Sequence, residues 1–222
     1  MMRICVSLMV ERADRVLAAM NKAQDLDADL LEWRLDITQT PDLEDTLGQA
    51  PLPVISTVRS REHGGRFQGG RDEQLRLLLR VAGLGSEYLD WEFESGQTLP
   101  PELYRIRDQV ILSYHNLHGT PPDRDLLSLF EEMATTGAGV VKIVTRANRI
   151  EDNLALLSLL GRGRPEGLEV VAFCLGPLGR ISRVACPLVG GAFTYAALEP
   201  GALAASGQLT LSQLRQILEV LR

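Results

Sequence analysis

Strand-like and helix-like segments alternate along almost the whole chain of 222 residues. Short apolar runs such as VILSYH (110–115) and VVKIVT (140–145) are each followed by a stretch with helical apolar spacing. Eight strand–helix pairs are predicted, with strands near residues 3–9, 30–37, 53–59, 88–93, 110–115, 140–145, 169–176 and 190–197. This alternation indicates a parallel sheet covered by helices.

Eight such units favour an α/β fold of the (βα)8 TIM-barrel type, and no stretch resembles an interdomain linker. We therefore expect a single catalytic domain over residues 1–222. The alternative is an open, doubly wound sheet. No GxGxxG sequence follows a strand, which weakens the nucleotide-binding version of that alternative.

Charge and cysteine content exclude several kinds of partner. The net charge is -6 and no basic run occurs, which argues against nucleic acid or an anionic membrane as partner. No segment approaches the ~18 apolar residues of a membrane span. Three irregularly spaced cysteines, Cys5, Cys174 and Cys186, fit neither a disulfide framework nor a metal site. We expect a cytoplasmic protein with reduced thiols.

Charged side chains recur on one face of several predicted strands, because residues two apart point the same way. The groups that share a face are Glu32, Arg34 and Asp36, then Thr57 and Arg59, then Asp90 and Glu92, then Ser113 and His115. A solvated face, as in antiparallel sheets, is one interpretation. In a helix-covered parallel barrel this face lines the interior, which opens at the C-terminal strand ends where barrel enzymes hold their active sites.

Lys142 lies in the middle of the apolar stretch GVVKIVT, where an unpaired ammonium would be costly. It could form an interior ion pair with Glu32 or Asp90. It could equally be a nucleophile, because burial and nearby cations favour the neutral amine that attacks a carbonyl. His115 ends the preceding strand, and histidine commonly moves protons near neutral pH. Together the two residues suggest Schiff-base chemistry followed by elimination of water.

Motifs spread over nearly the whole chain resemble those of the type I 3-dehydroquinate dehydratases of the shikimate pathway. They are CVSL (5–8), LLEWRLD (30–36), STVRSREHGG (56–65), YLDWEF (88–93), SYHNLHGTP (113–121), VVKIVT (140–145), GRISR (179–183) and SGQ (206–208). The resemblance implies a barrel enzyme without metal or cofactor, usually a homodimer. Its small-molecule substrate would be 3-dehydroquinate, dehydrated to 3-dehydroshikimate.

The same resemblance assigns roles by position. Lys142 matches the Schiff-base lysine, His115 the general acid–base group, and Arg183 the arginine that binds the substrate carboxylate. Other matching positions are expected to contact the substrate or line its site: Ser7, Glu32, Arg34, Arg59, Asp90, Glu92 and Gln208.

Four departures affect the outer part of this site. A glutamate usually orients the catalytic histidine, but here His63 occupies its position and Glu62 precedes it. Asn116 and Leu117 replace the aspartate and phenylalanine that usually follow that histidine. The closing loop has Ala204 at its usual serine, so that contact is either absent or displaced to Ser206. Phe173 and Leu175 replace methionines before GRISR.

Two other functions compete with this assignment. A class I aldolase-type barrel also uses a lysine imine, and LVGGAF (188–193) resembles the glycine-rich phosphate loop it would need. A non-catalytic binding module is supported only by the change at His63. An inactive relative would more often have lost Lys142 or His115.

Overall fold

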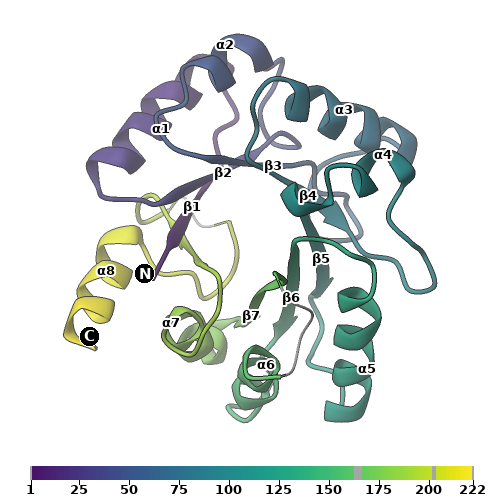
Figure 1. Cartoon of the computed structure of the whole chain (residues 1–222). Helices are drawn as coiled ribbons and strands as arrows, with labels where there is room; N and C mark the ends of the chain where they lie inside the picture. Colours follow the sequence, from purple (N-terminus) through teal and green to yellow (C-terminus); the bar gives the residue numbers. More distant parts are fainter. Residues whose placement is uncertain (1, 163–166, 202–203, 222) are drawn as a thin grey trace. The chain divides into compact units, whose positions relative to one another are not determined.

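The computed structural model describes residues 2–162, 167–201 and 204–221 (Figure 1). These residues contain eight strands in one sheet, in the order β7-β6-β5-β4-β3-β2-β1-β8. The strands are β1 (Ile4–Leu8), β2 (Leu30–Arg34), β3 (Val54–Thr57), β4 (Tyr88–Glu92), β5 (Val110–Asn116), β6 (Val140–Arg146), β7 (Glu169–Leu175) and β8 (Thr194–Ala197). Neighbouring strands with an assigned register run parallel.

A helix follows each strand, as the sequence pattern predicts. The α-helices are α1 (Val16–Asp25), α2 (Leu43–Gly48), α3 (Arg71–Gly83), α4 (Pro101–Tyr104), α5 (Asp123–Ala134), α6 (Asp152–Leu160), α7 (Arg180–Leu188) and α8 (Leu211–Val220). Short 3-10 turns are η1 (Ala13–Arg15), η2 (Arg107–Gln109) and η3 (Pro177–Gly179).

The chain divides into two compact units. The middle unit comprises Trp91–Thr194 and Ala205–Gln208, together with Met1–Met2. The terminal unit comprises Arg3–Asp90, Tyr195–Ala204 and Leu209–Arg222. A single domain over the whole chain remains a prediction.

In the terminal unit, α1, α2 and α3 cover one face of β1, β2 and β3 (Figure 1). Met20 of α1 and Leu78 of α3 are fully buried, as are Leu31 and Trp33 on the apolar face of β2. Removing such side chains from water supplies most of the driving force for packing. The alternate residues Glu32 and Arg34 therefore point to the other side of the sheet.

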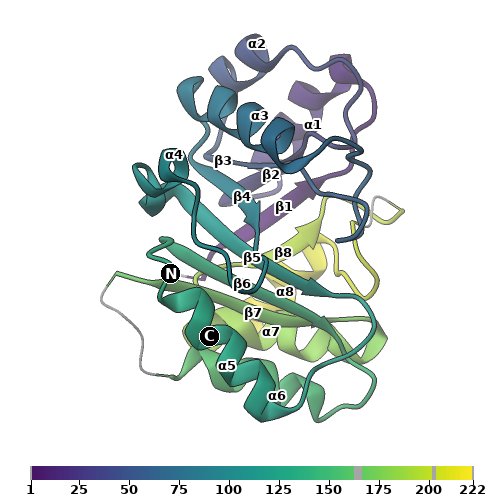
Figure 2. The same cartoon turned by 90° about the vertical axis from the view of Figure 1, so that its right-hand side faces the viewer.

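In the middle unit, α5, α6 and α7 lie along one face of β5, β6 and β7 (Figure 2). Leu126, Phe130 and Met133 of α5 are buried at the helical spacing expected for an amphipathic helix. Ser113 of β5 is paired with Lys142 of β6, which is in turn paired with Val171 of β7. This register fixes which polar residues of the unit share a face.

The second strand is shorter than its sequence pattern predicts. β2 stops at Arg34, because the amides of Ile37 and Thr38 turn back to hydrogen-bond the Arg34 carbonyl at 3.0 and 3.2 Å. Asp36 therefore lies in a turn, and the strand-face argument for it is wrong. Its side chain nevertheless returns to Arg34, through contacts made by the turn.

Candidate active site

Lys142 and His115 lie on one face of the β5–β6 pair in the middle unit. Lys142 is partnered with Ser113, and His115 follows Ser113 by two residues and is partnered with Val144. The two side chains are thus offset by one strand spacing of ~4.8 Å and two residues, ~6.6 Å, along the strand. Lys142 is only 2% exposed, whereas His115 is half-buried. In this arrangement the Lys142 amine could attack the carbonyl of a bound compound while the His115 imidazole transfers a proton to or from the same molecule.

Arg183 of α7 presents a buried cation in the same unit. Its side chain is 1% exposed, and its guanidinium stacks over the ring of Phe173 at 4.5 Å from the centroid. Phe173 is paired with Val144 and therefore shares the face of His115. Nε and Nη2 of Arg183 have no hydrogen-bond partner among the described residues. A buried guanidinium with open donors is suited to a carboxylate ligand.

Burial also changes the acidity of this arginine. It lowers the pKa of Arg183 to about 10, and the neighbouring Cys174 and Cys186 offset only part of that change. Arg183 remains charged at neutral pH, so an anion bound there would relieve the cost of the buried charge.

The motif GRISR holds α7 against β7. A Cβ at Gly179 would lie 2.5 Å from the Cys174 carbonyl oxygen, so only glycine permits this approach. The Ser182 hydroxyl accepts a 2.8 Å hydrogen bond from the Cys174 amide and donates to the Gly179 carbonyl. The Thr194 hydroxyl donates to the Arg183 carbonyl at 2.8 Å. These contacts fix the helix that carries Arg183.

The SGQ segment packs on the end of β7. Gly207 has φ +80°, and a Cβ there would lie only 2.0 Å from the Gly176 carbonyl oxygen. The Gly176 amide donates to the Ser206 carbonyl at 2.9 Å. Gln208 is consequently buried at 6% exposure, while the Ser206 side chain is exposed.

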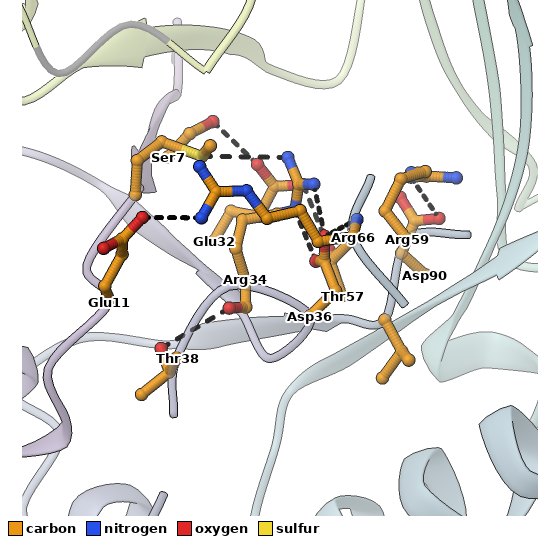
Figure 3. A network of polar contacts seen from close by, with 12 residues as sticks. Ser7, Glu11, Glu32, Arg34, Asp36, Thr38, Thr57, Arg59, Arg66 and Asp90 are labelled. Carbon is orange, nitrogen blue, oxygen red and sulfur yellow. Dashed lines mark hydrogen bonds and ion pairs between the residues drawn. The ribbon is translucent and has the colours of Figure 1, made fainter. Parts of the chain in front are cut away.

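Glu32 is the centre of a hydrogen-bond group in the terminal unit (Figure 3). Ser7 donates to its Oε2 at 2.7 Å, and Thr57 donates to its Oε1 at 3.0 Å. The three residues come from β1, β2 and β3, whose register places Ser7, Glu32 and Ile55 in one row. Each carboxylate oxygen thus has a buried hydroxyl partner, as a buried charge requires.

Two buried ion pairs lie beside this group. Arg34 pairs with Asp36 and Arg59 pairs with Asp90, each at 2.7 Å between nitrogen and oxygen. Burial by itself lowers the pKa of Arg34, but the hydrogen bonds and charge of Asp36 outweigh it and leave that pKa raised. Buried opposite charges thus compensate one another, between β2 and the turn that follows it and between β4 and the residues just after β3.

Tyr195 of β8 also belongs to this environment, although its sequence context does not distinguish it from a core aromatic. It is 5% exposed, and burial, then the negative charges of Glu32, Cys5 and Asp90, raise its pKa well above the ordinary value. Its phenol therefore stays protonated and able to donate a hydrogen bond throughout the physiological range.

The two residues considered for orienting His115 differ in exposure. Both lie in the turn that follows β3, where Glu62 is exposed and His63 is half-buried.

The structure thus gathers the predicted residues into two groups. The middle unit holds Lys142, His115, Arg183, Ser206 and Gln208, and the terminal unit holds Ser7, Glu32, Arg34, Arg59, Glu62 and His63. Within the described ranges, no three His, Cys, Asp or Glu side chains form a group that could hold a metal ion. No helix in those ranges is long and apolar enough to cross a membrane.

Comparison with known proteins gives one consistent result. A family model described as type I 3-dehydroquinase matches residues 4–222. A 3-dehydroquinate dehydratase of Syntrophobacter fumaroxidans is 37% identical over 200 residues, covering 86% of each chain. One of Thermococcus onnurineus is 41% identical over 205 residues, covering 91% of this chain and 92% of that protein.

Solved structures agree. The 3-dehydroquinate dehydratase of Geobacillus kaustophilus HTA426 matches 100% of this chain and 91% of its own, with a TM-score of 0.87 and 25% identity. The enzyme of Aquifex aeolicus VF5 matches 99% of this chain and 98% of its own, with a TM-score of 0.80 and 28% identity. These matches confirm the expected (βα)8 barrel fold class.

Proposed function

Because this chain belongs to the type I 3-dehydroquinase family, we propose that it is a hydro-lyase that converts 3-dehydroquinate to 3-dehydroshikimate through an imine on Lys142. The observation that carries the mechanism is the placement of a buried lysine and a histidine on one face of β5 and β6. The relatives named above support the substrate.

The first step forms the imine. The neutral Nζ of Lys142 attacks the ketone carbon of the substrate, and the carbonyl oxygen leaves as water after taking one proton from the amine and one from solvent. The resulting iminium withdraws electrons from the adjacent C–H bond, which lowers the barrier to its deprotonation. A nucleophile fixed in a buried strand also avoids the entropy cost of bringing two reactants together.

The second step eliminates water. His115 accepts the proton from the carbon adjacent to the iminium, and the electron pair forms the new C=C bond as the β-hydroxyl departs. The same imidazolium gives its proton to that hydroxyl, so the leaving group is water and the histidine ends neutral. Such acid–base assistance is worth ~100- to 10,000-fold in rate. Hydrolysis of the imine then releases the product and restores the amine of Lys142.

Arg183 binds the substrate carboxylate in this proposal. Its burial, its lowered pKa and the open donors on Nε and Nη2 all favour an anionic ligand. Stacking on Phe173 holds the planar guanidinium without occupying its hydrogen-bond donors. Gln208, held by Gly207 against the end of β7, adds a polar contact to the same ligand, and Ser206 supplies a hydroxyl in that segment.

The family motifs assign further roles to residues of the terminal unit. Ser7, Glu32, Arg34 and Arg59 are assigned to the substrate hydroxyls and ring through their match to the family motifs. His63 is the preferred partner for orienting His115, since the Glu62 carboxylate is exposed.

The glycine-rich segment LVGGAF has a structural role that does not require phosphate. A Cβ at Gly191 would lie 2.3 Å from the Cys186 sulfur and 2.7 Å from its carbonyl oxygen. The Gly191 amide donates to that carbonyl at 2.8 Å. The glycines therefore serve the close turn after α7, which removes the main support for an aldolase-type phosphate loop.

A homodimer is part of the proposal, and α6 and α7 offer the surface for it. Large apolar side chains are exposed along these helices and the segments beside them: Ile150, Leu154, Leu178, Ile181, Leu188 and Val189. Exposed apolar groups of this extent are typical of protein interfaces. Sedimentation of the wild type and of Leu154→Glu tests this, and an unchanged mass for the variant would rule out this face. The buried free thiols fit the expected cytoplasmic location.

The mechanism is tested by adding 3-dehydroquinate and borohydride and mapping the modified peptide by mass spectrometry. We expect a ligand-sized increase on the peptide that contains Lys142, and none in Lys142→Met. Absence of an adduct on the wild type, despite measured ligand binding, would exclude the imine mechanism. If the protein converts 3-dehydroquinate but no adduct forms, the proposed activity would stand and the role of Lys142 as the imine-forming residue would not.

A further inference from the structure

The Asp36 carboxylate is a junction between two parts of the terminal unit (Figure 3). Its Oδ1 accepts a 2.7 Å hydrogen bond from Nε of Arg34, and its Oδ2 accepts one of 2.7 Å from Nη2. Oδ2 also accepts a 3.0 Å hydrogen bond from the backbone amide of Arg66. The Asp36 side chain is completely buried and its bonds to Arg34 are partly buried, whereas the bond from the Arg66 amide is exposed.

The two hydrogen bonds to Asp36 leave the Nη1 side of the Arg34 guanidinium available. Asp36 occupies Nε and Nη2, whereas Nη1 contacts the Met9 sulfur at 3.8 Å, a weak acceptor. Arg34 is 7% exposed, so its orientation is set by these contacts and not by solvent. A bidentate carboxylate pair fixes the plane of a guanidinium as well as its position.

The second arm of the junction reaches the glycine-rich loop after β3. Arg66 lies in that loop, which turns back on itself through the Phe67 amide bonded to the Arg59 carbonyl at 3.0 Å. The Gly65 amide bonds to the Ser60 carbonyl at 2.8 Å, and a Cβ at Gly65 would lie 2.0 Å from the Arg59 carbonyl oxygen. These hydrogen bonds define the backbone path of the loop. Asp36 is the buried side chain to which the loop is bonded through the Arg66 amide.

A second contact of the loop is exposed. Arg66 pairs with Glu11 at 2.5 Å, with side chains 61% and 54% exposed. Exposed ion pairs of this kind contribute little, typically about 0–1 kcal/mol. The hydrogen bond from the Arg66 amide ends on a completely buried carboxylate that Arg34 also holds, which makes it the stronger restraint on this part of the loop.

We propose that Asp36 is a positioning residue that aligns Arg34 for the substrate and anchors the loop of residues 60–70. This inference rests on the proposed function for its effect on turnover, since Arg34 is assigned there to the substrate. Its effect on the loop is independent of any activity. The same carboxylate serves both, so loss of Asp36 disturbs substrate binding and the loop together.

The kinetic test compares Asp36→Asn, Arg34→Met and the double variant with 3-dehydroquinate as substrate. We expect Asp36→Asn to raise KM by roughly tenfold, as for the loss of a hydrogen bond to a charged group, with a smaller change in kcat. Because Asp36 acts through Arg34, adding Asp36→Asn to Arg34→Met should raise KM no further. Independent, additive effects of the two substitutions would overturn the positioning role.

The loop is tested by tryptic cleavage after Arg61 and Arg66 of the folded full-length chain. Asp36→Asn should accelerate this cleavage roughly fivefold, because the uncharged amide has a single acceptor oxygen to satisfy both Arg34 and the Arg66 amide. Glu11→Gln is the matched control: it removes the exposed pair with Arg66 and should leave the rate nearly unchanged. Equal acceleration in both variants, or none in Asp36→Asn, would overturn the anchoring role.

These measurements separate the two proposals. Wild-type protein that neither converts nor traps 3-dehydroquinate would defeat the proposed function, while the cleavage rates would still decide whether Asp36 anchors the loop. If Asp36→Asn does not fold, Arg34→Lys tests the same Arg34–Asp36 pair by changing the arginine instead of the aspartate. It keeps the charge but loses the planar fork, and an unchanged KM would then count against the alignment of Arg34.

Discussion

Lys142 and Ser113 are direct partners in the parallel ladder of β5 and β6. This single pairing determines the geometry of the chemistry, because His115 follows Ser113 by two residues and so shares the face of Lys142. A slip of the register by one residue would turn one of the two side chains toward the helices. The apolar residues on the opposite face, including Val141 and Ile143, are fully buried and oppose such a slip.

His115→Gln should separate imine formation from elimination. We expect kcat to fall by ~100- to 10,000-fold, because the proton acceptor and donor is lost. Borohydride should still attach substrate to Lys142, since the amine is unchanged. Loss of trapping together with turnover would instead show that His115 is needed to form the imine.

Arg183→Lys should weaken substrate binding although it preserves the positive charge. The ammonium lacks the planar fork that binds a carboxylate through two hydrogen bonds and stacks on Phe173. We expect KM to rise by roughly ten- to a hundredfold, which steady-state kinetics would measure. Phe173→Leu, which removes the stacking but retains the guanidinium, should raise KM by a smaller factor.

Asp90→Ala should destabilise the protein strongly. The Asp90 side chain is fully buried and that of Arg59 is 5% exposed, so the substitution removes a carboxylate partner from a buried cation. Breaking such a pair typically costs about 3–5 kcal/mol, measurable by urea denaturation. The matched control is Glu199→Ala, which breaks the half-exposed pair with Lys22 and should cost about 1 kcal/mol at most.

Gly207→Ala should displace the segment that carries Gln208. Alanine disfavours φ +80°, and its Cβ would meet the Gly176 backbone. We expect a lower melting temperature and a higher KM. Gly48 ends α2 and has no atom within 4 Å of an added Cβ, so Gly48→Ala should change neither. A normal KM for Gly207→Ala would mean that Gln208 does not need this backbone path.

Thiol labelling should be slow in the native protein. Burial raises the pKa of Cys186 to about 12 and also raises that of Cys174. A thiol whose pKa lies above the pH stays protonated, and only the thiolate reacts. At pH 8 we expect no incorporation of iodoacetamide into folded protein and rapid labelling of all three cysteines in urea. Stoichiometric labelling without urea would indicate that a buried thiol is transiently exposed.

Much of this architecture is encoded locally and can be predicted. Apolar alternation identifies the β2 residues Leu31 and Trp33, and helical spacing identifies the buried residues of α5. The side chains of Lys142 and His115 follow from strand parity alone. These predictions succeed because each depends on residues close together in the sequence.

Backbone turns and tertiary contacts are not accessible in the same way. The turn after Arg34 is closed by local backbone hydrogen bonds that side-chain spacing does not reveal, so period-2 spacing wrongly extends the strand through Asp36. The stacking of Arg183 on Phe173 joins a helix to a strand, and Tyr195 meets Glu32 only after folding. Both contacts depend on burial, and the side chains become buried only when separate segments pack together.

The terminal unit is discontinuous, and this affects how the chain folds as it is synthesised. β1 is followed in the sheet order by β8, and Arg215 of α8 binds Asp29, which in turn accepts the Ile4 amide at 2.7 Å. At ordinary translation rates, β8 and α8 are therefore synthesised on the order of ten seconds after residues 3–90. The middle unit draws most of its residues from one continuous stretch and has no such delay. Co-translational capture of the unpaired first strand by chaperones is the expected consequence.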